Sequence, residues 1–250
     1  MEWGNFGPVH IVTLVLAAAI LFGLYFALRR ASQKVQTAVL GVLSLSGVAA
    51  IIFNLLAWVA PLNYLPLHLC SINAMMLPFA VFTRNKTLGN LLLVWCLGAL
   101  AALVLNYEMV SVKVFSWTFL VYYFPHIMEF GIPILLFRLG LVKKDWRCIG
   151  STMSITMLIY TGVHLLNKFI NAWCLANSFS YNGSDIVTVN YMFSIEPINP
   201  LVELFYSIIP CEYWYMYMVL PIVLVYLLAV YAPQILSHLK QKKSSANTTV

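Results

Sequence analysis

Charged side chains are scarce in this sequence. Only 9% of its 250 residues are Asp, Glu, Lys or Arg, and 62% are hydrophobic, whereas about a quarter of the positions in a soluble domain are charged. Glycine and proline are few, at 12 and 11, and follow no period. The sequence also contains 15 Phe, 14 Tyr and 7 Trp. The many aromatic residues and the few, aperiodic glycines and prolines together exclude a disordered or collagen-like chain. The composition predicts an integral membrane protein.

The few charges lie between long apolar runs and sum to a formal net charge of +6. This distribution is typical of membrane orientation rather than of an acidic partner, so we expect no nucleic-acid partner. The amino end, Met1-Glu2-Trp3, is not basic, and the first apolar run is long enough to span a bilayer. We therefore expect no cleaved signal peptide.

Seven apolar stretches approach the roughly 20 residues that a helix needs to cross a bilayer. They run over residues 9–28, 38–60, 65–82, 88–107, 115–139, 149–171 and 213–231. Backbone amides in lipid must pair within their own segment, and an alternating barrel pattern and an internal repeat are both absent. The predicted fold class is all-α: a polytopic membrane protein with a seven-transmembrane-helix bundle.

Basic residues predict the orientation of this bundle. They fall in the first, third and fifth gaps and in the tail, which are then cytoplasmic. The amino terminus is therefore predicted outside and the carboxyl terminus in the cytoplasm. Residues 1–239 form a single transmembrane domain with an outer loop over 172–212, and residues 240–250 a disordered cytoplasmic tail. The expected location is a membrane crossed several times, the cell membrane if the chain is bacterial.

Polar side chains inside the predicted spans are the candidate functional residues, since each costs about 2–3 kcal/mol at mid-span. On three spans they form pairs three residues apart, which share a helix face. The pairs are Cys70 with Asn73, His126 with Glu129, and His164 with Asn167, and the second span adds Asn54. We expect the three pairs to meet in one pocket.

His68 and Cys70 are two residues apart, about 200° around a helix, so only one faces the pocket unless the turn at Pro66 is non-helical. Each histidine could instead be a structural hydrogen-bonding residue between helices, and Cys70 a small apolar residue. Glu129 needs a cation or a proton, and His126 is its nearest candidate partner.

Two further features concern the helix geometry and the outer loop. Pro125 removes an amide donor beside His126 and can open the fifth helix there. Cys174 and Cys211 both fall in or beside the outer loop, which predicts a disulfide between them. Around Phe205 this loop is either a short interfacial helix or irregular.

Several motifs together resemble one family. They are Leu65-Pro66-Leu67-His68-Leu69-Cys70-Ser71-Ile72, Tyr123-Phe124-Pro125-His126, Asn190-Tyr191-Met192-Phe193 followed by Pro197, and Tyr213-Trp214-Tyr215. In this order they are similar to those of the bacterial YwaF proteins and the related vertebrate transmembrane protein 164. The chain departs from that family in an apparent insertion over 172–189.

The resemblance implies a lipid acyltransferase that moves an acyl chain from a phospholipid to a lysophospholipid through a cysteine thioester. Carried over by position, Cys70 is the nucleophile and His126 the general base. Asn73 would stabilise the oxyanion and Glu129 would hold the imidazole tautomer, with His68 and His164 in support. Asn190, Tyr191 and Pro197 would cap the cavity or hold a headgroup, or only brace the helix ends. No metal or cofactor is expected.

Three other classes fit the same residues. Histidines on three spans could bind zinc in a hydrolase, although no His-x-x-x-His spacing is present. They could ligate a haem, which needs histidines at matched depths. Seven helices are equally compatible with a receptor or a channel that performs no chemistry.

Overall fold

The computed structural model describes residues 1–57, 60–107, 109–183 and 185–247, and within them the chain is helical without a β-strand. The helices are α1 (Pro8–Leu28), α2 (Gln33–Ala57), α3 (Leu69–Thr83), α4 (Lys86–Leu105), α5 (Trp117–Arg138), α6 (Cys148–Ala176), α7 (Pro200–Ile208) and α8 (Val219–Asn247). Three short 3-10 turns join them: η1 (Pro61–Tyr64), η2 (Tyr191–Phe193) and η3 (Trp214–Met218).

The predicted all-α, multi-pass membrane architecture is confirmed. Every one of the seven predicted stretches contains a helix, and six helical segments in the described part of the chain are long and apolar enough to cross a membrane. Helix α3 is shorter, at 15 residues, because its first turns are replaced by the extended segment around Pro66. The count of seven spans and the orientation stay predictions.

Short polar residues begin several of the helices by accepting a hydrogen bond from a free backbone amide. Asn85 accepts from the amide of Leu88 at the start of α4, and Ser116 accepts from Phe119 at the start of α5. Asn199 does the same for α7, where Pro200 fixes the first helical residue. Such caps satisfy donors that the helix itself leaves unpaired.

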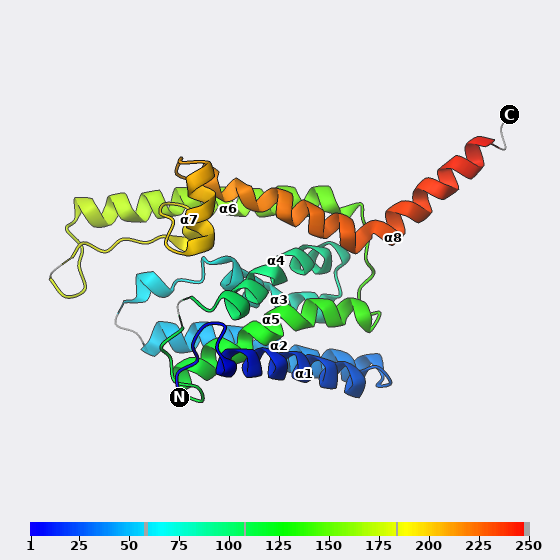
Figure 1. Cartoon of the computed structure of the whole chain (residues 1–250), viewed down its shortest axis with the longest axis horizontal. Coiled ribbons are helices and arrows are strands. Elements are labelled where there is room, and N and C mark those ends of the chain that lie inside the picture. The colour runs from blue at the N-terminus through cyan, green and yellow to red at the C-terminus, as the bar shows by residue number, and fades with distance from the viewer. Residues whose placement is uncertain (58–59, 108, 184, 248–250) are drawn as a thin grey trace.

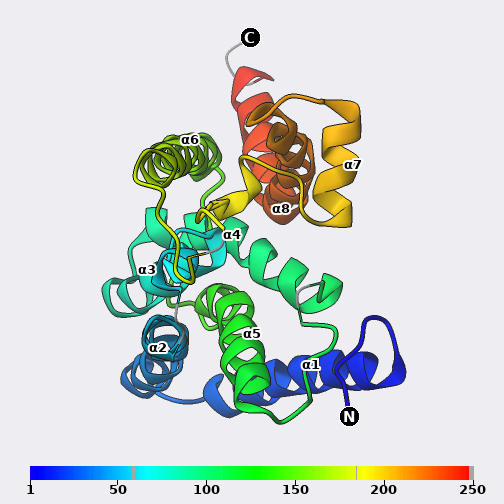
Figure 2. The ribbon, with the colours of Figure 1, turned by 90° about the vertical axis from the view of Figure 1, so that its left-hand side faces the viewer.

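The helices form three successive groups (Figures 1 and 2). Helices α1, α2 and α5 lie on one side, α3 and α4 in the middle, and α6, α7 and α8 on the opposite side, with the last turns of α8 projecting away from the bundle. Helices α5 and α4 are the most covered: 61% and 56% of their apolar windows are buried, against 11% of that of α6. The long helices α1 and α6, by contrast, present most of their surface to the surroundings.

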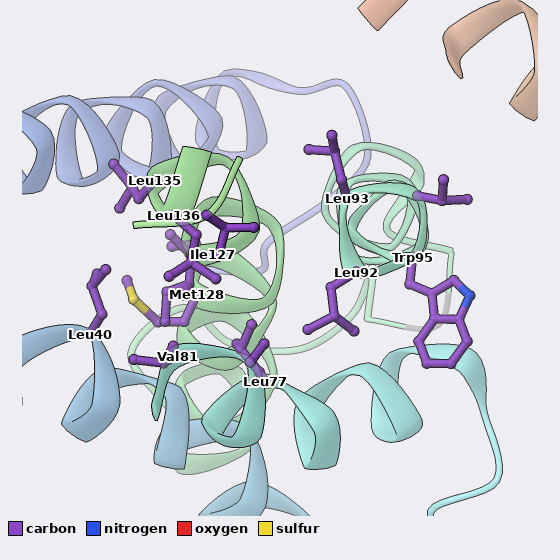
Figure 3. Packing of buried hydrophobic residues seen from close by; sticks show 14 of the residues in the cluster. Leu40, Leu77, Val81, Leu92, Leu93, Trp95, Ile127, Met128, Leu135 and Leu136 are labelled. Atoms are coloured by element: carbon purple, nitrogen blue, oxygen red, sulfur yellow. The ribbon is translucent and has the colours of Figure 1, made fainter. Parts of the chain in front are cut away.

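The main core lies between α2, α3, α4 and α5. Leu40 of α2 and Leu77 of α3 approach Met128 of α5, while Leu92 of α4 closes the space from the other side (Figure 3). All four side chains are buried. Burial of a large apolar side chain stabilises the fold by about 1.5–3 kcal/mol, so this four-helix contact is the rigid part from which the other elements extend.

The residues that precede α1 pair with the segment between α4 and α5. The Trp3 amide donates to the carbonyl of Val112 at 2.8 Å, and the Gly4 amide donates to that of Val110 at 2.8 Å. The Trp3 indole is fully buried, and its Nε1 donates to Thr13 Oγ1 at 2.8 Å. This amino-terminal ribbon therefore packs as part of the bundle.

The structure differs from the predictions made for the outer loop and for the tail. The predicted disulfide is wrong: Cys174 is free and buried near the end of α6, and Cys211 is free and exposed. Part of the outer loop is helical, since α6 continues to Ala176 and α7 occupies the region around Phe205. Residues 240–247, predicted as disordered, continue α8, in keeping with their Lys and Gln content, and 248–250 lie outside the described residues.

Candidate functional site

A cavity of about 330 Å³ opens between α2, α3 and α5. Cys70 of α3 and both His126 and Glu129 of α5 line it, together with Asn54 of α2. Its other polar lining comes from four hydroxyl side chains, those of Tyr64, Ser71, Thr118 and Tyr122. The structure therefore brings two of the three predicted polar pairs to one place, although Asn73 is not part of the lining.

The start of α3 separates Cys70 from His68. His68 is the residue before the helix, and its extended backbone (φ −74°, ψ 152°) follows the turn at Pro66. Its Nδ1 accepts the Met192 amide at 3.3 Å, and its ring lies 5.6 Å from that of Tyr191. Of the two alternatives that the sequence leaves open, Cys70 faces the cavity and His68 contacts the outer loop.

His126 is oriented by its own helix. Its Nδ1 lies 2.6 Å from the carbonyl oxygen of Tyr122, one turn earlier, and the two rings are 4.2 Å apart. A carbonyl only accepts, so Nδ1 carries the proton and Nε2 has the lone pair of the neutral ring. The orienting contact predicted for Glu129 is thus made by the Tyr122 carbonyl. This partner is a backbone carbonyl, which any residue four positions before His126 would supply, so the sequence carries no specific signal for it.

Glu129 and Asn73 are buried beside this cavity with unused acceptor atoms. Asn73 Nδ2 donates to the Glu129 backbone carbonyl at 3.3 Å, whereas Asn73 Oδ1 and Glu129 Oε2 have no hydrogen-bond partner. The predicted oxyanion donor is therefore used to hold α3 against α5. Buried acceptors without partners are rare and are commonly satisfied by water or a ligand, so this wall of the cavity can hold a polar group.

Gly47 allows α2 to approach this wall. A Cβ atom at Gly47 would lie 2.6 Å from the Cβ of Ala74 and 3.1 Å from Glu129 Oε1. The first distance is shorter than real Cβ contacts, and a side chain here would separate α2 from α3 or push into the Glu129 carboxyl. Glycine is consequently the residue that this close helix contact requires.

The third predicted pair, His164 and Asn167 of α6, lies elsewhere. Asn167 Nδ2 donates to the Tyr191 carbonyl at 2.8 Å and to Ser194 Oγ at 2.9 Å, and its Oδ1 accepts the Tyr191 amide at 3.1 Å. His164 Nδ1 lies 3.1 Å from Ser194 Oγ, and its Nε2 is 3.8 Å from Glu212. The prediction that three pairs meet in one pocket is therefore wrong for this pair, because the outer loop occupies its polar face.

Replacing Asn167 by Ala is expected to lower the free energy of unfolding by about 1–3 kcal/mol, because the buried backbone groups of Tyr191 lose their partners. The matched control is Asn177→Ala at the end of the same helix, where the side chain is exposed and donates only to the Trp173 carbonyl. Thermal unfolding of both variants in detergent measures the difference. Equal unfolding midpoints for the two variants would mean that the hydrogen bonds of Asn167 do not stabilise the fold.

The predicted substrate-binding residues lie in the outer loop over this α6 contact. Asn190 closes a local turn: its Nδ2 donates to the Glu196 carbonyl at 2.8 Å and its Oδ1 accepts the Ile195 amide at 2.9 Å. The Tyr191 hydroxyl donates to the Leu62 carbonyl, and burial raises the pKa of Tyr191 to about 12, so it stays a neutral donor. Pro197 follows this turn and is partly buried. None of the three lines the Cys70 cavity.

Two consecutive residues of this loop, in the turn η2, have a strained backbone. Met192 and Phe193 both lie in the left-handed region, with φ of 54° and 53°. This region costs an L-residue about 1–2 kcal/mol, and the contacts of His68, Asn167 and Tyr215 with residues 191–193 keep the segment in place. The loop is therefore held in a fixed, costly conformation against α3, α6 and η3.

The described part of the chain contains no group of three or more His, Cys, Asp or Glu side chains that could hold a metal ion. His68 and His164 contact the outer loop, and His126 lies in the cavity wall. The three histidines therefore do not form one ligand set in this structure.

A comparison with known protein families finds a match. The TMEM164 family model matches residues 5–232, which is nearly the whole chain and includes the cavity and the outer loop. Neither a curated protein nor a solved structure matches.

Proposed function

Because the chain belongs to the TMEM164 family, we propose that it moves an acyl chain between a phospholipid and a lysophospholipid through a thioester on Cys70. The observation that carries the proposal is that Cys70 and His126 line one cavity, on two helices that pack together. In this proposal Cys70 is the nucleophile and His126 the general base.

The state of the imidazole suits this role. With its Nδ1 proton directed at the Tyr122 carbonyl, His126 presents the lone pair of Nε2 as the basic atom. A thiol attacks a carbonyl only as the thiolate, and in apolar surroundings it needs a base to remove its proton. A fixed tautomer supplies such a base without a carboxylate partner.

The reaction then balances in two half-reactions. His126 Nε2 accepts the thiol proton, and the sulfur bonds to the ester carbonyl carbon of the donor phospholipid. The bond to the glycerol oxygen breaks, and this oxygen takes the proton from His126 and leaves as a lysophospholipid. In the second half-reaction the hydroxyl of another lysophospholipid gives its proton to His126, and its oxygen bonds to the thioester carbonyl carbon. The carbon–sulfur bond breaks, and His126 returns the proton to the sulfur, which restores the thiol.

The cavity lining supports an ester carbonyl rather than a phosphate as the group that enters. No Lys or Arg occurs among its described lining residues, so a phosphate would find no counter-charge there. The amide of Asn54 and the hydroxyls of Ser71 and Thr118 are neutral groups able to donate to an oxyanion. The phosphate of the substrate would therefore stay outside while its ester reaches Cys70.

The test is direct detection of the acyl-enzyme. Purified protein incubated with acyl-labelled phosphatidylcholine is expected to carry a hydroxylamine-sensitive label on Cys70, found by mass spectrometry, and added lysophospholipid is expected to discharge it. Cys148→Ala, at the start of α6 and outside the cavity, is the control that keeps the label. A protein that binds the lipid but shows no Cys70 adduct would instead be a binding protein.

A further inference from the structure

A second cavity, of about 170 Å³, lies on the other side of the first turn of α3. Leu69, the neighbour of Cys70, lines it with Met157 and Tyr160 of α6. The rest of its wall is formed by Thr156, Met192, Phe193, Met216, Tyr217, Val219 and Leu220. Neither Cys70 nor His126 takes part in this wall, so it is a separate space.

The wall offers a ligand almost no polar surface. Its three hydroxyl side chains are already hydrogen-bonded. Thr156 donates to the Thr152 carbonyl at 2.8 Å and accepts from Trp95 Nε1 at 2.9 Å. The Tyr160 hydroxyl donates to the Tyr213 carbonyl at 2.8 Å, and the Tyr217 hydroxyl is 2.6 Å from that of Tyr213. A buried water needs two to four polar partners, so neither water nor a polar headgroup fits here.

We infer that this apolar cavity binds a segment of a hydrocarbon chain from a membrane lipid. An engineered apolar cavity of about 150 Å³ stays dry and binds benzene, so a cavity of 170 Å³ takes a chain segment of about six carbons. Both α6 and the segment Trp214–Gln241 are largely uncovered by protein, at 11% and 17% buried. Lipid chains are therefore the apolar molecules beside the cavity.

Two properties of the wall favour a flexible chain as the occupant. Met157, Met192 and Met216 supply unbranched side chains that adapt to variable shapes, as methionines do on other binding surfaces. Met192 and Phe193 also have left-handed backbone, and residues held in such strained conformations cluster at ligand clamps. The hydrogen bonds that this strained segment makes with His68, Asn167 and Tyr215 thus fix one side of a lipid site.

Photochemical crosslinking tests the inference without relying on acyl transfer. The protein is reconstituted in phosphatidylcholine vesicles that include a phosphatidylcholine with a diazirine midway along one chain. After irradiation, adducts are expected on Met157, Met192 or Met216, assigned to single residues by fragmentation of the peptides. Met157→Trp, which fills the cavity, is expected to reduce this labelling to background, whereas Leu158→Trp on the exposed face of the same helix, 72% exposed, is expected to keep it.

If Met157→Trp does not fold, Leu220→Trp is used in its place, because Leu220 lines the same cavity from α8. Thermal unfolding verifies the fold of each variant. Wild-type labelling in a folded cavity-filling variant, or adducts no more frequent at Met157, Met192 and Met216 than at Leu158 and Leu165, would overturn the inference. Cys70→Ala is expected to label as the wild type does, so failure of the thioester mechanism and failure of this site give different results.

Discussion

Cys70→Ser and His126→Ala are each expected to leave a folded protein that has nearly lost acyl transfer. A hydroxyl is much harder to ionise than a thiol in the same apolar cavity, and without the imidazole the thiol has no base. General-base catalysis by a positioned side chain contributes about 10²–10⁴-fold, so the His126 variant is expected to lose that much in rate. Because the two residues act as one unit, the double variant is expected to be little slower than either single one.

The measurement is the rate of chain transfer from phosphatidylcholine to lysophospholipid in detergent or vesicles. His238→Ala is the matched control, since this histidine is exposed on α8 and outside the cavity. Both single variants are also expected to bind the donor lipid as the wild type does, so that only the rate of acyl transfer falls. A Cys70→Ala protein that transfers chains at the wild-type rate would remove the thioester mechanism.

Much of this fold and part of the site follow from local sequence features. Apolar runs near the bilayer length are visible one by one, and in lipid each has to be a helix. Cys70, His126 and Glu129 stand out because polar residues within such runs are costly. Their shared cavity is consistent with the facing positions of α3 and α5, and Pro66 indicates the extended turn that directs His68 away from Cys70.

The remaining contacts depend on long-range packing. His164 and Asn167 resemble the other pairs in spacing, yet the outer loop reaches α6 and takes up their polar groups. The spacing of two residues along a helix predicts that they share a face, but it does not predict which other element packs against that face. Likewise, Asn73 is one turn from Cys70, and only the approach of α5 shows that its amide is used on the Glu129 carbonyl. The second cavity arises from the path of residues 191–193, which no periodicity predicts.

Trp3, which lies outside both cavities, packs against the first turns of α5. Its indole is fully buried and meets the rings of Phe119, Tyr122 and Tyr123 edge-on, with centroids 4.9, 5.9 and 5.8 Å away. Tyr122 in turn orients His126 through its carbonyl. The amino-terminal ribbon is thus connected through one aromatic contact to the proposed general base.

Trp3→Ala is accordingly expected to lower the free energy of unfolding by about 3–5 kcal/mol, the usual cost of truncating a buried Trp. Trp3→Phe keeps a ring against α5 and loses the hydrogen bond to Thr13, so it is expected to lie between Trp3→Ala and the wild type. Trp117→Ala, five residues before Tyr122 in the same helix but 76% exposed, is the control with little expected change. Thermal unfolding followed by circular dichroism ranks the three, and a Trp3→Ala midpoint equal to that of Trp117→Ala would mean that the ribbon does not brace α5.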